Sequence, residues 1–162
     1  MTGALDAFNA AACTAAQEQM MTCCASRSFA RAMEEGRPYH EPDDLDAAIG
    51  AVFYGLSWAD IAEAVSAHPR IGEPAPEGAS TGEQAGAAGA ADEVREALAA
   101  GNRAYEERFG HVFLICASGL TGEEMLGELQ ARLRNNIASE RALVRRELLR
   151  ITRLRAGKLL GA

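Results

Sequence analysis

The strongest constraint on the fold of this chain is its last segment, whose pattern predicts one long amphipathic helix from Ser139 to the end. Val144, Leu148 and Ile151 recur at helical spacing and mark a buried stripe. Continuing that stripe reaches Arg155, whereas the neighbouring arginines fall beside it. A guanidinium keeps its proton, so burying one without an anionic partner is very costly. The sequence therefore predicts a carboxylate that meets Arg155, supplied either by this protein or by a ligand.

Helix signals also dominate the rest of the chain, and β-branched residues are sparse. Capping patterns at Thr14–Gln17, Ser80–Glu83 and Thr121–Glu124 mark three helix starts, and Gly or Pro marks most helix ends. The predicted helices cover residues 14–25, 26–35, 42–56, 57–68, a stretch from 80, 92–109, 121–135 and 139 to the end. The run 112–117 is the only strand-like piece. We expect an all-α fold: a single compact domain over residues 1–162, with about eight helices and one short extended segment, 112–117.

Composition and charge exclude several classes of partner. The net charge of −7 argues against a nucleic-acid partner. Most basic residues lie between Arg132 and Arg155, alternate with apolar ones, and are expected on the solvated face of a helix. No stretch reaches the ~20 apolar residues of a membrane span, and no signal peptide is evident. The four cysteines show no Cys-x-x-Cys spacing, which favours a reducing cytoplasm.

Familiar catalytic motifs are also missing from the sequence. The three histidines are far apart and form no His-x-x-x-His or His-Glu-x-x-His pattern, so no metal site is expected. No Gly-x-Ser-x-Gly elbow is present, and the Gly-rich stretch at 82–89 lacks the Lys-Ser/Thr of a phosphate loop.

The candidate acid–base residues each have a structural alternative. His68 follows Val65 by three residues, so it continues the apolar face of its predicted helix and points inward. A core histidine with satisfied hydrogen bonds explains it, and so does an acid–base group at the edge of a pocket. Ser80 and Glu83 are explained as a capping box, although the same helix start offers N–H groups and a hydroxyl to an anion. Gln84 adds an amide that can donate and accept.

The apolar run 112–117 raises a question about its backbone. It is most simply a buried segment, but an extended segment leaves N–H and C=O groups without helical partners. These groups could pair with another strand or with a polar, planar ligand. No second strand candidate of similar strength exists, so a ligand is slightly favoured.

Several motifs then occur in an order that resembles one known family. They are His68-Pro69-Arg70-Ile71-Gly72, Ser80-x-x-Glu83-Gln84-Ala85-Gly86, Asn102-x-x-Tyr105-x-x-Arg108-Phe109-Gly110-x-x-Phe113-x-Ile115-Cys116, Cys23-Cys24-x-Ser26, Arg132-Leu133-x-Asn135 and Ile151-x-x-Leu154-Arg155. Each motif is weak alone, but the ordered set is highly specific and runs over essentially the whole chain. The chain resembles OHCU decarboxylase, in full 2-oxo-4-hydroxy-4-carboxy-5-ureidoimidazoline decarboxylase.

The resemblance implies an all-helical, cofactor-free enzyme that is often a homodimer. It implies the step of urate breakdown in which OHCU, a small molecule, loses carbon dioxide and becomes (S)-allantoin. In that family pattern His68 matches the catalytic histidine, Glu83 its acidic partner, and Arg155 the arginine that holds the substrate. The substrate-contacting segments are matched by Pro69, Ser80, Thr81, Gly82, Glu83, Gln84, Phe113, Leu114, Ile115, Cys116 and Ala117.

The sequence also allows two rival functions. The same residues could serve a hydrolase or isomerase of another ureido or hydantoin compound, which would need an activating metal or a positioned water. Alternatively, the chain could be a helical binding module in which His68 and Arg155 close a buried polar network. Such a module would show no turnover and would expose an apolar groove, which the even spacing of charges does not suggest.

Overall fold

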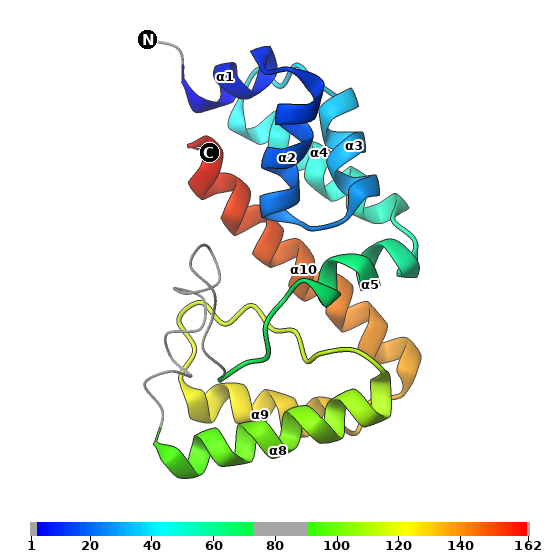
Figure 1. Ribbon diagram of the computed structural model, residues 1–162, viewed down its shortest axis with the longest axis vertical. Coiled ribbons are helices and arrows are strands. Elements are labelled where there is room, and N and C mark those ends of the chain that lie inside the picture. Colours follow the sequence, from blue (N-terminus) through cyan, green and yellow to red (C-terminus); the bar gives the residue numbers. More distant parts are fainter. Residues whose placement is uncertain (1–2, 73–90, 162) are drawn as a thin grey trace. The chain divides into compact units, whose positions relative to one another are not determined.

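The computed structural model describes residues 3–72 and 91–161, and within them the chain forms eight α-helices and no strand (Figure 1). The helices are α1 (Ala4–Ala10), α2 (Cys13–Cys23), α3 (Arg27–Glu35), α4 (Pro42–Gly55), α5 (Trp58–Ser66), α8 (Asp92–Phe109), α9 (Gly122–Arg132) and α10 (Ile137–Leu160). The all-α prediction is confirmed. The helix expected from Ser80 lies outside the described residues, and α1 was not predicted.

Local capping chemistry explains most helix boundaries. The Ser26 side chain accepts a hydrogen bond from the Phe29 amide and caps α3. Thr121 caps α9 as predicted, and Gly110 ends α8 with φ +79°, a backbone conformation that favours glycine. The capping box predicted at Thr14 is wrong. α2 begins one residue earlier, at Cys13, because α1 ends at Ala10 and only two residues separate the two helices.

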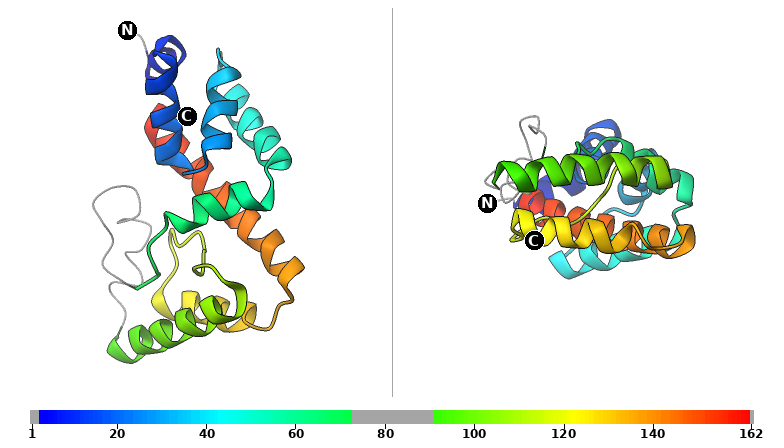
Figure 2. Two further views of the ribbon diagram at one scale, coloured as in Figure 1. Left: turned by 45° about the vertical axis from the view of Figure 1, so that its right-hand side comes forward. Right: turned by 90° about the horizontal axis from the view of Figure 1, so that it is seen from below.

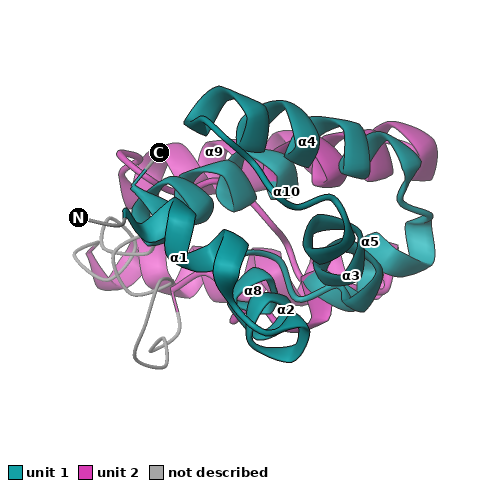
Figure 3. Cartoon of the chain, turned by 90° about the horizontal axis from the view of Figure 1, so that it is seen from above, with its two compact units in different colours: residues 1–64, 148–162 teal, residues 65–147 magenta. Residues whose placement is uncertain are grey.

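The described chain divides into two compact units, which Figure 3 distinguishes by colour. The first unit consists of residues 1–64 and 148–162, and the second unit consists of residues 65–147. Two helices, α5 and α10, contribute residues to both units.

The first unit is built on α2, α3 and α4. α3 packs against both of the others, and Phe29 of α3 meets Phe53 of α4 edge to face, with ring centroids 5.5 Å apart. The Arg37 guanidinium binds the carbonyl oxygens of Phe8 and Ala11, at 2.8 and 2.7 Å. These bonds add to the backbone hydrogen bond from the Ala11 amide to the Phe8 carbonyl, at 3.3 Å, at the C-terminal end of α1.

The terminal helix α10 has the predicted buried stripe in the correct phase. Val144, Leu148 and Ile151 are buried, and Arg146 is exposed. Arg155 is half-buried rather than fully buried, and the buried stripe continues through Thr152, Ala156 and Leu160.

The second unit pairs α8 with α9, which lie side by side and run in the same direction (Figures 1 and 2). The connection between them returns along the pair and contains 112–117, which is neither helix nor strand. Apolar side chains from this connection, both helices and the residues after α5 form one core. The buried members of this core are Ile71, Leu98, Tyr105, Phe113, Ile115, Ala117, Met125 and Leu129.

Among the described residues, no single helix combines the length and hydropathy of a membrane span. In the described part of the chain, α4 and α5 taken together reach that length and composition, but they are bent by 113° at the break between them.

Candidate active site

The predicted site residues fall into three groups in the structure. His68, Pro69 and the segment 113–117 belong to the second unit, and Arg155 belongs to the first. Ser80, Thr81, Gly82, Glu83 and Gln84 lie outside the described residues.

His68 lies just beyond the end of α5 rather than on it. The helix ends at Ser66, two residues before the predicted end, and the His68 amide donates to the Val65 carbonyl at 3.0 Å. The residue before a proline disfavours helical backbone, and Pro69 follows directly. Both side chains are half-buried, so the imidazole lies at the boundary between core and solvent.

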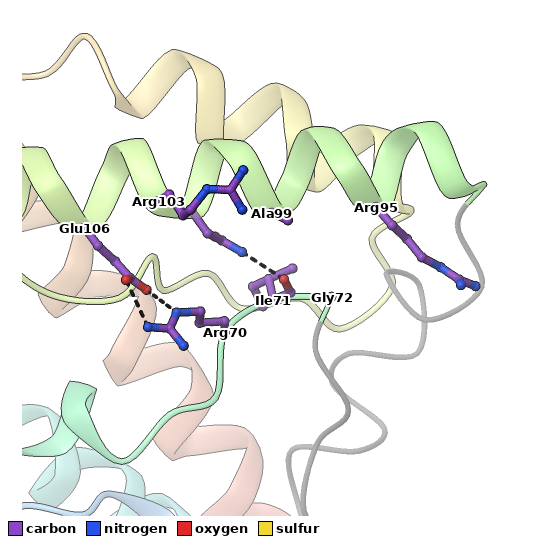
Figure 4. Close-up of a pocket in the computed structure, with 8 residues that line it drawn as sticks. Arg70, Ile71, Gly72, Arg95, Ala99, Arg103 and Glu106 are labelled. Atoms are coloured by element: carbon purple, nitrogen blue, oxygen red, sulfur yellow. Dashed lines mark hydrogen bonds and ion pairs between the residues drawn. The ribbon is translucent and has the colours of Figure 1, made fainter.

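Helix α8 anchors the residues that follow His68 through two contacts. The Glu106 carboxylate accepts hydrogen bonds from Arg70 Nε at 2.6 Å and from Arg70 Nη2 at 3.1 Å. The Asn102 side chain donates from Nδ2 to the Ile71 carbonyl at 2.9 Å. Figure 4 shows Arg70 and Glu106 facing each other, with Ile71 beside the helix. The backbone from 70 to 72 is thereby fixed to a rigid element.

A cavity of about 290 Å³ lies between this anchored segment and α8. It is lined by Arg70, Ile71, Gly72, Arg95, Ala99, Asn102, Arg103 and Glu106. None of these residues was in the predicted site. The signal that could have found them is the pair of motifs around Arg70 and Asn102, which were noted only for their family resemblance.

The segment 113–117 is buried, and protein side chains form hydrogen bonds with two of its backbone groups. Arg132 Nη1 donates to the Leu114 carbonyl at 2.7 Å, and Glu147 accepts from the Cys116 amide at 3.2 Å. The sequence left two alternatives for these groups, a second strand or a ligand. The structure adds a third, because charged side chains from the following helices satisfy them.

Arg132 corrects the prediction that the basic residues from 132 onward lie on a solvated face. Its side chain is only 4% exposed, and its guanidinium lies 4.6 Å from the Phe113 ring centroid. Its Nε donates to Glu140 at 2.8 Å. Arg132 is thus a buried cation with a carboxylate partner inside the protein.

Glu140 is the centre of this buried network. Its Oε1 also accepts from the Tyr105 hydroxyl, and its Oε2 accepts from Asn135 Nδ2 at 3.0 Å. Burial alone would raise the pKa of Glu140, but hydrogen bonds from Arg132, Tyr105 and Asn135 hold that pKa below its usual value. Burial and the neighbouring carboxylate raise the pKa of the Tyr105 hydroxyl. The network therefore holds a carboxylate and a protonated phenol at neutral pH.

In the first unit, Arg155 lies close enough to two buried thiols to act on their titration. Burial raises the pKa of Cys24 to about 11, and hydrogen bonding with Thr152 and with the Ser26 backbone, together with a smaller effect of the Arg155 charge, opposes that rise. Burial likewise raises the pKa of Cys23, against a smaller opposing effect of Arg155. The charge of Arg155 thus acts on the titration of both thiols, although Arg155 is far from them in the sequence.

Within residues 3–72 and 91–161, no group of three His, Cys, Asp or Glu side chains is arranged to hold a metal ion.

The sequence model of the OHCU decarboxylase family matches residues 9–157 of this chain. A curated relative from Amia calva, 2-oxo-4-hydroxy-4-carboxy-5-ureidoimidazoline decarboxylase, is 37% identical over 135 residues, covering 78% of this chain and 76% of its own length. The uric acid degradation bifunctional protein TTL of Arabidopsis thaliana is 34% identical over 151 residues, covering 88% of this chain. The chain spans about half of that longer protein, 47% of its length.

Solved structures agree with these matches. An OHCU decarboxylase crystallised in the presence of (S)-allantoin superposes with a TM-score of 0.80 at 29% identity, covering 90% of this chain and 99% of that one. An (S)-allantoin synthase superposes with a TM-score of 0.75 at 16% identity, covering 96% of this chain and 53% of that one, and supports the fold alone.

One of these relatives is named for uric acid degradation and the other for OHCU decarboxylation. The chain belongs to the OHCU decarboxylase family, whose activity is that of a carboxy-lyase. The resemblance drawn from its motifs is confirmed.

Proposed function

We propose that this chain catalyses the cofactor-free decarboxylation of OHCU to (S)-allantoin. The observation that carries the proposal is the family match over residues 9–157, which spans both His68 and Arg155. The relative from Amia calva is named for this activity, and the similar crystal structure was obtained with the product present.

The reaction needs an electron sink, which the substrate itself provides. When the carbon–carbon bond to the carboxylate breaks, carbon dioxide leaves and the electron pair spreads into the ring C=N and carbonyl groups. No pyridoxal or thiamine is then required. The protein has to hold the carboxylate, orient the ring, and deliver one proton to one face of the resulting carbanion.

In this proposal each predicted residue has one of those tasks. Arg155 holds the substrate carboxylate with its planar guanidinium. His68, assisted by Glu83, delivers the proton. Pro69 and the stretch Ser80–Gln84 contact the substrate.

The peptide groups of 113–117 are proposed to bind the polar edge of the ring. Leu114 and Cys116 each have a backbone group held by a protein side chain. Ile115 lies between them, is 6% exposed, and has no backbone hydrogen bond to the described residues. A buried peptide group without a partner is costly. A ligand with one N–H and one C=O on the same edge would satisfy Ile115.

Purified protein, stripped of metal, is expected to convert freshly prepared OHCU to a single enantiomer of allantoin. OHCU is labile, so loss of absorbance alone does not establish catalysis, whereas uncatalysed protonation has no facial preference. Chiral chromatography of the product therefore provides the measurement. Racemic allantoin at every protein concentration would contradict the proposed function.

Arg155→Lys is expected to raise KM for OHCU by roughly 10- to 150-fold, which corresponds to about 1.5–3 kcal/mol for a hydrogen bond to a charged group. Lysine keeps the positive charge but cannot form the bidentate pair of hydrogen bonds that a guanidinium makes with a carboxylate. Arg146→Lys is the matched control, because Arg146 is exposed on the same helix. Equal KM values for the two variants would show that Arg155 does not bind the substrate.

We also propose that residues 1–162 act as one domain that contains both units, since the family match runs through them. The enzyme is proposed to be a cytoplasmic homodimer. The cytoplasmic assignment is supported by four cysteines without a disulfide, and the dimer rests on the family resemblance. Sedimentation equilibrium of the purified chain would test the dimer.

A further inference from the structure

One turn of α8 carries three polar side chains that reach outside their own helix. Asn102, Tyr105 and Glu106 stand at positions i, i+3 and i+4, which share one face of a helix. Asn102 is 3% exposed and Tyr105 is fully buried. We refer to these three residues as the α8 clamp.

The two outer residues of the clamp hold the segment that carries His68. Asn102 donates to the Ile71 carbonyl, and Glu106 binds the Arg70 guanidinium through two hydrogen bonds (Figure 4). Ile71 is also part of the buried core of the second unit. The backbone two to three residues after His68 is therefore fixed to α8 by both polar and apolar contacts.

The central residue of the clamp, Tyr105, is connected to the segment 113–117 through two buried side chains. The Tyr105 hydroxyl donates to Glu140, which accepts from Arg132, and Arg132 donates to the Leu114 carbonyl. The Tyr105 ring also packs edge to face on Phe113, at 5.3 Å between centroids. The position of 113–117 thus depends on the same turn of α8.

We infer that the α8 clamp sets the position of His68 relative to the peptide groups of 113–117. Its members are positioning residues, because they act through Arg70, Ile71 and Arg132 rather than on the substrate. The inference rests on the proposed function, in which His68 delivers a proton to a ring held by 113–117. Displacing either segment should misdirect that proton, and misplacement by about 1 Å can cost 100-fold in rate.

The hydrogen bonding of Asn102 fits a positioning role better than a purely stabilising role. Among the described side chains, Asn102 Oδ1 is the buried polar atom without a hydrogen bond. Such an orphan acceptor is destabilising, and an apolar side chain of similar size would avoid it. Asparagine at this position makes sense if its N–H bond to Ile71 is required for geometry.

The test compares Asn102→Leu, Tyr105→Phe and Glu106→Gln with Glu107→Gln, a matched control on the exposed face of α8. For each variant, kcat, KM and the enantiomeric excess of allantoin are measured, together with Tm and amide hydrogen exchange of peptides covering 68–72 and 113–117. The clamp variants should lower kcat by roughly tenfold or more, with KM within about threefold, and should lower the enantiomeric excess. Glu107→Gln should match the wild-type chain.

Hydrogen exchange assigns each clamp residue to its segment. Asn102→Leu and Glu106→Gln should speed exchange in 68–72, and Tyr105→Phe should do so in 113–117. Wild-type kcat and enantiomeric excess in all three variants would overturn the inference. If the wild-type chain itself makes no chiral allantoin, the proposed function fails instead, and the exchange data alone then decide the clamp. Unchanged hydrogen exchange in 68–72 and in 113–117 in all three variants would refute the clamp, and faster exchange in these segments would support it.

Discussion

His68→Asn is expected to lower kcat for OHCU by roughly 10²- to 10⁴-fold, the usual contribution of a general acid or base. Asparagine keeps a polar side chain of similar width but cannot exchange a proton near neutral pH. Because His68 is half-buried and lies beyond the end of α5, we expect Tm to shift by only a few degrees. The measurement is kcat at saturating OHCU, with chiral analysis of the product.

The control for this prediction is His40→Asn, since His40 is exposed and belongs to the first unit. It should leave kcat unchanged. The sequence also allowed His68 to be an ordinary core histidine. A stable His68→Asn variant with nearly wild-type kcat and full enantiomeric excess would favour that alternative and remove His68 from the mechanism.

Arg132→Met is expected to have the largest effect on stability, lowering the free energy of unfolding by about 3–5 kcal/mol. The substitution leaves the Glu140 carboxylate, which is fully buried, without its cation. It also removes the donor to the Leu114 carbonyl. Urea unfolding followed by circular dichroism measures the change.

The control is Arg134→Met, two residues further along the chain and exposed, which should change stability by less than about 0.5 kcal/mol. The double variant Arg132→Met with Glu140→Leu should recover part of the loss, because it removes the stranded charge. Similar unfolding curves for Arg132→Met and Arg134→Met would contradict a stabilising role for the network.

The network also predicts how stability depends on pH. The pKa of Glu140 is lowered in the folded chain, so its contribution is present above the ordinary carboxyl pKa. That contribution is lost as the pH falls through the lowered value in the folded state. Acid should therefore reduce the difference in stability between the wild-type chain and Arg132→Met.

Features set by neighbouring residues were predictable from the sequence. The cap at Thr121 depends on a side chain three residues from its partner and was predicted correctly, as was the helix start at Ser26. The phase of α10 follows from the spacing of Val144 and Leu148 alone. Helix α1 was missed because it is short, with seven residues, and its N-cap is a glycine rather than a side-chain cap.

Features set by distant residues were not predictable in this way. Arg132 looked like one more surface arginine, because its burial depends on Leu114 before it and Glu140 after it. The partners of Asn102 and Glu106 could not be assigned for the same reason, since they lie more than thirty positions away. The motif pattern pointed to the family, but the structure was needed to assign contacts to Arg132, Asn102 and Glu106.

The four cysteines can report the unfolding of the chain, because their accessibility to a thiol reagent depends on the fold. Cys13 is exposed, whereas Cys23, Cys24 and Cys116 are buried. A water-soluble alkylating reagent therefore meets one sulfur on the native chain and four on the unfolded one. The mass of the alkylated protein therefore measures the fraction of unfolded molecules, and the measurement needs no substrate. The loss of activity in a variant can in this way be separated from the loss of its fold within a single sample.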